Sequence, residues 1–403
     1  MKKIQTLIEN DFFLATILSA FIVSQFFALK ITAIGISLLG IIGITLLLYN
    51  KFYKKTKLQK LQPIVYCWLV VYLVRVVWLF FSNSRSDGFL WLDRCLPMLL
   101  FPLILQYYPL NEKIIKFVLT FFVRFCLAFC LITIGIIIYN IITFPVSVSA
   151  WLNTPKSFYP LAFSWSNYDH PSYLCIIYLL SLPVGLYLNR HYRNITFIEL
   201  AILFIAETIV IIFTGARIGF IIIPTLLFIM IIYIMPQRKL KIISFITMIT
   251  IALIGTVVLF TFKNSFLDTF KDSERSCLRE IAISSIKENP LIGVGTGGMK
   301  SIFDKANVAG DLIINPHNQY LGEIMQFGII GAIPLFVTLI YLFIIALQRK
   351  DFLLLSFLLV LMIIMLTEMP FDTGKGLPFA LFFSSLFLVI SQNNKNVSKI
   401  QIT

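Results

Sequence analysis

Long apolar runs separated by short polar turns make up most of this chain. Twelve runs approach the length of about 20 residues with which a helix crosses the hydrocarbon core of a bilayer. They lie at residues 12–29, 31–49, 63–81, 93–108, 117–142, 171–189, 196–214, 217–235, 242–262, 322–347, 352–368 and 377–391. Only helices and closed barrels satisfy every backbone group in lipid. The pattern therefore predicts an all-α integral membrane protein with about twelve transmembrane helices.

Composition agrees with this pattern. Hydrophobic residues make up 59% of the 403 residues and charged residues only 13%, whereas a soluble domain carries roughly 25% charge. The first apolar run has no small-residue cleavage site, so we expect an anchor and not a removable signal. Three regions result: helices one to nine over 1–262, a large loop over 263–321, and three helices with a tail over 322–403.

Lysine and arginine set the expected orientation, because they concentrate in cytoplasmic loops. Five lysines lie between Lys51 and Lys60, and further basic residues occupy 190–193, 238–241 and 349–350. These loops and both termini should be cytoplasmic, which places segments 143–170 and 263–321 on the outer face. The formal net charge of +14 fits attraction to anionic lipid, and nothing in the sequence indicates nucleic-acid binding.

The most distinctive polar stretch closes the long loop. It reads Pro316-His317-Asn318-Gln319-Tyr320-Leu321 and runs directly into the apolar helix predicted from Gly322 to Leu347. Histidine is the side chain that changes charge near neutral pH. Where a loop meets the membrane surface, it can take a proton from an incoming hydroxyl. The alternative is that His317 only caps or anchors the helix.

The rest of the loop predicts a surface helix followed by a glycine-rich turn. Apolar residues recur at helical spacing among charged ones over 274–288, which indicates an amphipathic helix on the outer surface. The helix should end before Pro290, because the residue preceding a proline disfavours helix. Gly293, Gly295 and Gly297 could let backbone N–H groups approach an anionic or glycan ligand. The same glycines would also suit a plain turn.

Arginine placement is the second signal. Arg217 falls in a tight turn, Thr214 to Gly219, expected at the outer ends of two helices, where its planar fork suits a phosphate. It could instead extend to the membrane interface. Arg275 and Arg279 are one helical turn apart and could share a face. Four further charged residues in or near spans should form structural pairs or interface anchors: Arg75, Arg124, Glu199 and Glu207.

The sequence shows no cofactor or metal signature. Five of the six cysteines lie within or beside predicted spans, so we expect no disulfide. No Cys/His cluster has the spacing of metal ligands, and no nucleotide-binding loop is present. The residues themselves therefore indicate neither a metal nor a cofactor.

Four stretches together resemble the O-antigen ligase and polymerase superfamily, bacterial polytopic enzymes that act on undecaprenyl-diphosphate glycans. They are TGARIG at 214–219, RSCLREIAISSIKENPLIGVGTG at 275–297, PHNQYLGEIMQFGII at 316–330, and HPSY at 170–173. The resemblance covers mainly residues 165–335. The chain departs from the family pattern at Ala216, where serine or threonine is usual. The usual tryptophan of the 275–288 helix is absent, and Arg279 stands near its place.

The resemblance implies a metal-independent, inverting glycosyltransferase of the bacterial inner membrane with its site on the periplasmic face. His317 would be the general base on the acceptor hydroxyl. Arg217, Arg275 and Arg279 would hold the lipid diphosphate and stabilise its charge as it leaves. Further substrate contacts would come from Gly293, Gly295, Gly297, Asn318, Tyr320 and His170.

Three functions remain open at this point. An O-antigen ligase would move glycan from undecaprenyl diphosphate to lipid A–core, which the compact histidine loop favours. An O-antigen or capsule polymerase would use the same donor and another lipid-linked glycan as acceptor. A multi-span transporter or flippase would place polar sites near the bilayer midplane in two related halves, but no half-repeat is visible.

Overall fold

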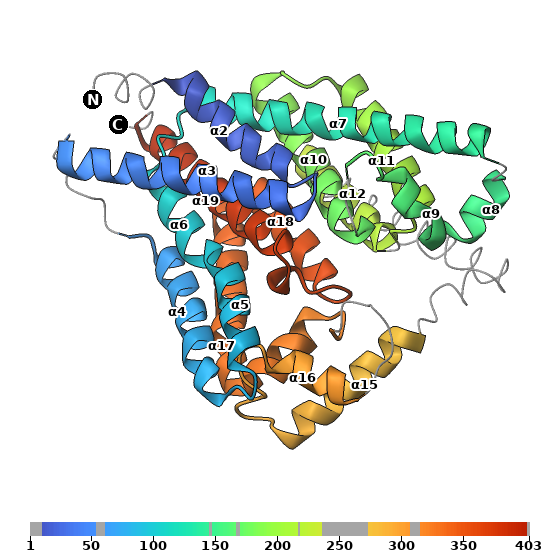
Figure 1. Ribbon diagram of the computed structural model, residues 1–403. Coiled ribbons are helices and arrows are strands. Elements are labelled where there is room, and N and C mark those ends of the chain that lie inside the picture. The colour runs from blue at the N-terminus through green and yellow to red at the C-terminus, as the bar shows by residue number, and fades with distance from the viewer. Residues whose placement is uncertain are drawn as a thin grey trace. The chain divides into compact units, whose positions relative to one another are not determined.

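The computed structural model describes residues 10–53, 61–144, 147–166, 170–216, 218–235, 273–306 and 315–400. Every regular element in these ranges is helical (Figure 1), which confirms the all-α prediction. The chain divides into two compact units. Unit 1 comprises residues 1–118 and 277–403, and unit 2 comprises residues 119–276.

Unit 1 combines helices from both ends of the chain. Its N-terminal helices are α2 (Asp11–Ser24), α3 (Leu29–Leu48), α4 (Pro63–Trp78), α5 (Arg85–Cys95) and α6 (Pro97–Tyr107). Its C-terminal elements are most of α15 (Ser273–Glu288), then α16 (Gly298–Lys305), α17 (Gln319–Arg349), α18 (Phe352–Ile364), the short 3-10 helix η3 (Pro370–Asp372) and α19 (Gly376–Ile400). α17 packs on α4 and α18, and α19 packs on α6 and α18.

Unit 2 is a second helical bundle. α7 (Glu112–Thr143) begins in unit 1 and continues into unit 2, followed by α8 (Val148–Asn153), α9 (Pro155–Ala162), α10 (Pro171–Tyr192), α11 (Phe197–Thr214) and α12 (Gly219–Ile234). α10 packs on α11 and α12, and α11 packs on α8 and α9. A capping box formed by Thr196 and Glu199 begins α11, which satisfies two backbone donors of its first turn.

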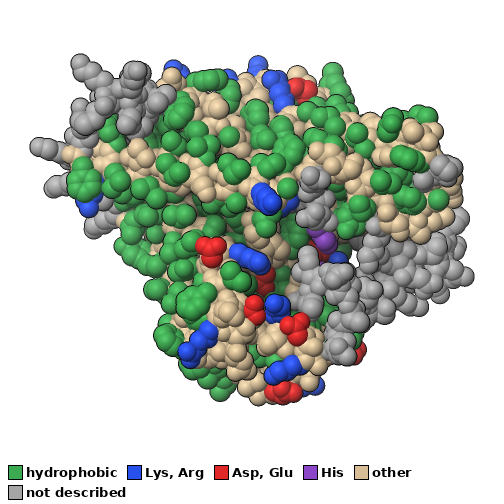
Figure 2. Space-filling view, viewed as in Figure 1, with side chains coloured by type: hydrophobic (Ala, Val, Ile, Leu, Met, Phe, Trp, Pro, Cys, Tyr) green, Lys and Arg blue, Asp and Glu red, His purple; other side chains and the backbone are tan. Residues whose placement is uncertain are grey.

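The helices agree with most of the predicted spans. Seven described helices are long and apolar enough to cross a membrane, and four shorter apolar helices accompany them. Together they cover eleven of the twelve predicted spans, and the remaining one, 242–262, lies outside the described residues. Hydrophobic side chains cover much of the visible surface (Figure 2), as a surface that faces lipid requires.

The fourth predicted span, 93–108, corresponds to a candidate membrane span that begins earlier, at Arg85, and ends at Tyr107. This span consists of two helices, α5 and α6, which meet at Leu96 and Pro97. The prediction placed its start too late because α5 carries charged residues, with Asp87 in its first turn and Arg94 in its last.

α17 folds back on itself at Gly328, so the predicted single helix from Gly322 to Leu347 is wrong. The ring centroids of Tyr320 and Phe336 are 6.0 Å apart, whereas the rise of a straight helix would separate these positions by about 24 Å. Gly328 has φ 61° and ψ −175°, a conformation that is essentially restricted to glycine. Helix α17 is therefore a hairpin whose longer arm, after Gly328, packs on α4 (Figure 1).

Candidate active site

His317 lies in the turn that precedes α17, with a backbone conformation that is unusual for a residue other than glycine. Its φ is 46°, in the left-handed region, where such residues are uncommon. The side-chain oxygen Oδ1 of Asn315 accepts the N–H of His317 at 2.8 Å, which stabilises the turn. The imidazole remains 15% exposed. It is therefore held by its surroundings and still accessible from outside the protein.

A buried carboxylate faces this imidazole. Nδ1 of His317 lies 3.3 Å from Oε2 of Glu368, whose side chain is 3% exposed. A carboxylate at Nδ1 favours the tautomer with its proton on Nδ1 and leaves Nε2 able to accept a proton. A nucleophile-activating base held by a third group has this arrangement. The two residues are 51 positions apart, and no sequence pattern indicates that they pair.

Two residues that we predicted to contact substrate hold the histidine turn in place. Asn318 caps α17 by accepting the N–H of Leu321 at 3.0 Å, and its Nδ2 donates to the carbonyl of Leu366 at 3.1 Å. The hydroxyl of Tyr320 donates to the carbonyl of Met362 at 3.1 Å. Both side chains thus connect α17 to the end of α18. Their contact with substrate stays a prediction.

A buried ion pair lies on the first arm of the α17 hairpin. The guanidinium of Arg75 on α4 is 3.0 Å from the carboxylate of Glu323, and both side chains are 1% exposed. The same guanidinium lies 5.1 Å from the ring centroid of Trp91 and 5.0 Å from that of Phe327. Arg75 therefore forms a structural pair, as the sequence suggested, and its partner is the carboxylate that sequence reasoning missed.

Hydrogen bonds extend this pair toward η3. Nε2 of Gln319 donates to Glu323 at 3.3 Å, and Nε2 of Gln326 donates to Oδ2 of Asp372 at 3.3 Å. Burial raises the pKa of Asp372 to about 7, and the nearby Glu323 carboxylate adds to the rise while Arg75 opposes it. Asp372 therefore changes charge near neutral pH.

The glycine-rich segment packs against the hairpin. Gly293, Gly295 and Gly297 have φ values of 73°, 81° and 78°, in the left-handed region that favours glycine. Their N–H groups donate to Asn289 O, Gln326 O and Gln326 Oε1 at 2.9, 2.8 and 3.5 Å. These bonds explain the glycines by packing. The contacts do not support the hypothesis that these N–H groups bind an anionic ligand.

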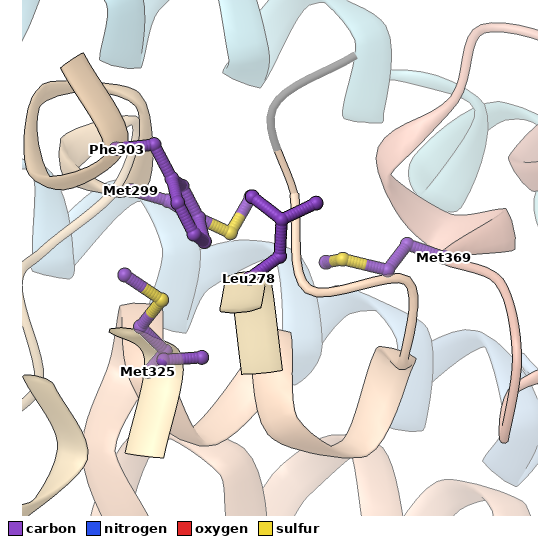
Figure 3. Packing of buried hydrophobic residues seen from close by; sticks show 6 residues of the cluster. Leu278, Met299, Phe303, Met325 and Met369 are labelled. Atoms are coloured by element: carbon purple, nitrogen blue, oxygen red, sulfur yellow. The ribbon is translucent and has the colours of Figure 1, made fainter. Parts of the chain in front are cut away.

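An apolar cluster joins α15 to the segment that carries Glu368. Its buried members are Leu278, Ala282, Met299, Phe303, Met325 and Met369. Figure 3 shows Leu278 of α15 between Met369 on one side and Met299 with Phe303 on the other. Leu278 precedes Arg279, and Met369 follows Glu368. The cluster therefore packs the chain next to Arg279 against the chain next to Glu368.

The two arginines of α15 differ in their surroundings. The predicted helix over 274–288 is confirmed as Ser273–Glu288, with Arg275 and Arg279 one turn apart. The Nε atom of Arg279 is buried and has no hydrogen-bond partner among the described residues. A buried donor of this kind costs free energy unless a ligand or water occupies it. Arg275 belongs to unit 2, whereas Arg279 belongs to unit 1.

The remaining predicted site residues belong to unit 2. Arg217 lies outside the described residues, but the turn around it is confirmed: α11 ends at Thr214, Gly215 has φ 68°, and α12 begins at Gly219. His170 precedes α10, with its ring 5.5 Å from that of Tyr173.

Charged side chains gather on the face of unit 1 around α5 and α16 (Figure 2). There, Lys300 of α16 lies 3.5 Å from Asp87 of α5, which also accepts a hydrogen bond from Ser84 at 2.7 Å. Among the residues that the structure describes, no three His, Cys, Asp or Glu side chains are grouped so that they could hold a metal ion.

The described residues define a polytopic, all-α membrane protein with a histidine–carboxylate pair and a buried arginine Nε that has no hydrogen-bond partner among them. Residues 200–336 match the family model described as O-antigen ligase, and this stretch includes α11, α12, α15, the glycine-rich segment and the histidine turn. The match supports the O-antigen ligase superfamily, and with it a glycan-transferring enzyme of the ligase or polymerase type. No curated protein matches this chain.

Proposed function

We propose that this protein transfers a glycan from undecaprenyl diphosphate to a hydroxyl of lipid A–core, with His317 as the general base. The His317–Glu368 pair carries the proposal, because a carboxylate at Nδ1 at 3.3 Å leaves Nε2 as the basic atom of a partly exposed imidazole. The family match supports the coarser conclusion that the enzyme transfers a lipid-linked glycan.

In the proposed reaction, Nε2 of His317 takes the proton of the acceptor hydroxyl as its oxygen attacks the anomeric carbon of the donor sugar. The bond from that carbon to the diphosphate oxygen breaks, its electron pair leaves with undecaprenyl diphosphate, and the anomeric configuration inverts. Glu368 stabilises the imidazolium that forms. No metal is part of this scheme.

Arginines stabilise the charge of the departing diphosphate in this proposal. Arg279 is the best supported, because its buried Nε has no hydrogen-bond partner in the described part of the chain and suits a phosphate oxygen. Arg217 and Arg275 complete the proposed set by resemblance to the family. The site then faces the periplasm, with both termini of the chain in the cytoplasm of a bacterial inner-membrane protein.

Purified protein in lipid vesicles, supplied with undecaprenyl-diphosphate glycan, tests the proposal with and without lipid A–core. Glycan on lipid A–core is the expected product. Longer lipid-linked chains formed without that acceptor would instead identify a polymerase. If folded protein forms neither product with any of several donors, glycan transfer is contradicted and a transporter is favoured.

A matched pair of histidine variants tests the base. His317→Ala should lose transfer, because no other group takes the proton. His191→Ala should keep it, since His191 stacks on Tyr187 with ring centroids 4.2 Å apart and contacts its carbonyl at 3.1 Å. Full transfer by a folded His317→Ala variant would show that the assignment of the base is wrong.

A further inference from the structure

Gln319 forms hydrogen bonds to the chain before and after Glu368, the residue that faces the proposed base His317. Its N–H donates to the carbonyl of Met365 at 2.8 Å, and its side-chain Oε1 accepts the N–H of Phe371 at 2.9 Å. Met365 and Phe371 stand three residues before and three residues after Glu368. We propose that Gln319 is a positioning residue that keeps the Glu368 carboxylate at hydrogen-bond distance from His317, an inference that rests on the proposed role of His317.

The segment that Gln319 holds has little structure of its own. Between the end of α18 at Ile364 and η3 at Pro370, the chain forms turns without a helix. Glu368 keeps one bond to the preceding helix, from its N–H to the carbonyl of Ile364 at 2.8 Å. The position of its carboxylate therefore depends on bonds from α17. Misplacement of a reacting group by about 1 Å can lower a rate on the order of 100-fold.

The buried ion pair fixes the orientation of the Gln319 amide. Gln319 is fully buried, and its Nε2 donates to Glu323 at 3.3 Å while Oε1 accepts from Phe371. A flipped amide would place its oxygen against the carboxylate and its NH₂ against an N–H group, so both bonds would be lost. Because Arg75 holds Glu323, the pair acts on Glu368 through Gln319.

The first test replaces Gln319 by methionine, which has similar size and keeps the backbone bond to Met365 but loses the side-chain bonds to Glu323 and Phe371. We expect a kcat about 10-fold to 100-fold lower, in the range of lost orienting partners, with an unchanged KM for the donor. A residue with a purely structural role would reduce the yield of folded enzyme without lowering the kcat of the folded fraction.

Gln392→Met is the matched control. Gln392 accepts a hydrogen bond from Gln62 at 2.7 Å at another place in unit 1, so its replacement removes a comparable glutamine contact outside the site. This variant should keep the wild-type kcat.

Gln319→Glu supplies a test that does not depend on the methionine variant being folded. The new carboxyl keeps an acceptor for the N–H of Phe371 but lies against Glu323, with Arg75 on α4 and Asp372 on η3 as the other charged neighbours. Two adjacent carboxyls share a proton at low pH and repel each other when both ionise. Activity relative to wild type should therefore fall as pH rises.

The outcomes separate this inference from the proposed function. If His317→Ala is inactive while Gln319→Met keeps the wild-type kcat, the positioning role alone is overturned. A Gln319→Glu variant whose activity relative to wild type is the same at every pH also overturns it. A fully active His317→Ala variant overturns the proposed function and the positioning role together.

Discussion

Removing the guanidinium of Arg75 should destabilise the protein strongly. Arg75 and Glu323 are each 1% exposed and 3.0 Å apart, and breaking such a pair by removing one partner costs about 3–5 kcal/mol. The rings of Trp91 and Phe327 lie about 5 Å from the guanidinium and contribute up to about 2 kcal/mol within that total. We expect Arg75→Met to lower the free energy of unfolding by about 4 kcal/mol.

A double-mutant cycle isolates the pair from other effects of each substitution. In Arg75→Met/Glu323→Gln neither member of the pair remains charged, so the double variant should lose about 2 kcal/mol less than the sum of the single variants. Unfolding of the purified protein in mixed micelles, titrated with a denaturing detergent and followed by tryptophan fluorescence, measures each free energy. Losses that add to within about 0.5 kcal/mol would refute the reasoning.

Three further predictions concern other parts of the chain. Gly328→Ala should cost roughly 1–3 kcal/mol or more, measured as a lower melting temperature, because φ is 61° and the Leu291 backbone fills the space of a Cβ; an unchanged melting temperature would argue against the hairpin. Asp372→Asn should stabilise the protein at pH 8 by up to about 4 kcal/mol. The pKa of Asp372 is raised from 3.8 to about 7 in the folded protein, so its ionisation lowers the free energy of unfolding as pH rises between these values. That gain should disappear toward pH 4, and a gain independent of pH would contradict it. Arg124→Gln should change the free energy of unfolding by less than about 1 kcal/mol, because its ion pair with Glu199, at 3.3 Å, is 59% and 30% exposed. A loss as large as that of Arg75→Met would show that exposure does not determine the strength of these ion pairs.

The predicted helices depended on apolar length, which is a local property of the chain. This is why eleven of twelve predicted spans correspond to described apolar helices. The fold-back of α17 is not local. The N–H groups of Ile329 and Ile330 donate to the carbonyls of Pro290 and Leu291 at 2.9 and 3.2 Å, so the conformation of Gly328 depends on a segment distant in sequence. A glycine within an apolar run gives no sign of such a partner.

Sequence reasoning singled out the histidine of the candidate site, whose role stays a prediction, and did not find its carboxylates. His317 stood out because a histidine at the end of a polar loop is rare in an apolar chain, whereas its pairing with Glu368 requires the tertiary fold. Glu323 was visible as a carboxylate inside an apolar helix, a position that is expensive without a partner. That signal predicts a cation nearby, and the fold supplies Arg75.

The rate of glycan transfer as a function of pH tests the central claim most directly. Wild-type enzyme, His317→Ala and Glu368→Gln are compared as folded protein in vesicles with saturating donor and acceptor. We predict that His317→Ala is inactive at every pH. Glu368→Gln should have a lower maximal rate, because the imidazole loses its orienting carboxylate. Profiles of both variants that superimpose on the wild-type profile would contradict the assignment of His317 and Glu368 as a general base and its orienting carboxylate.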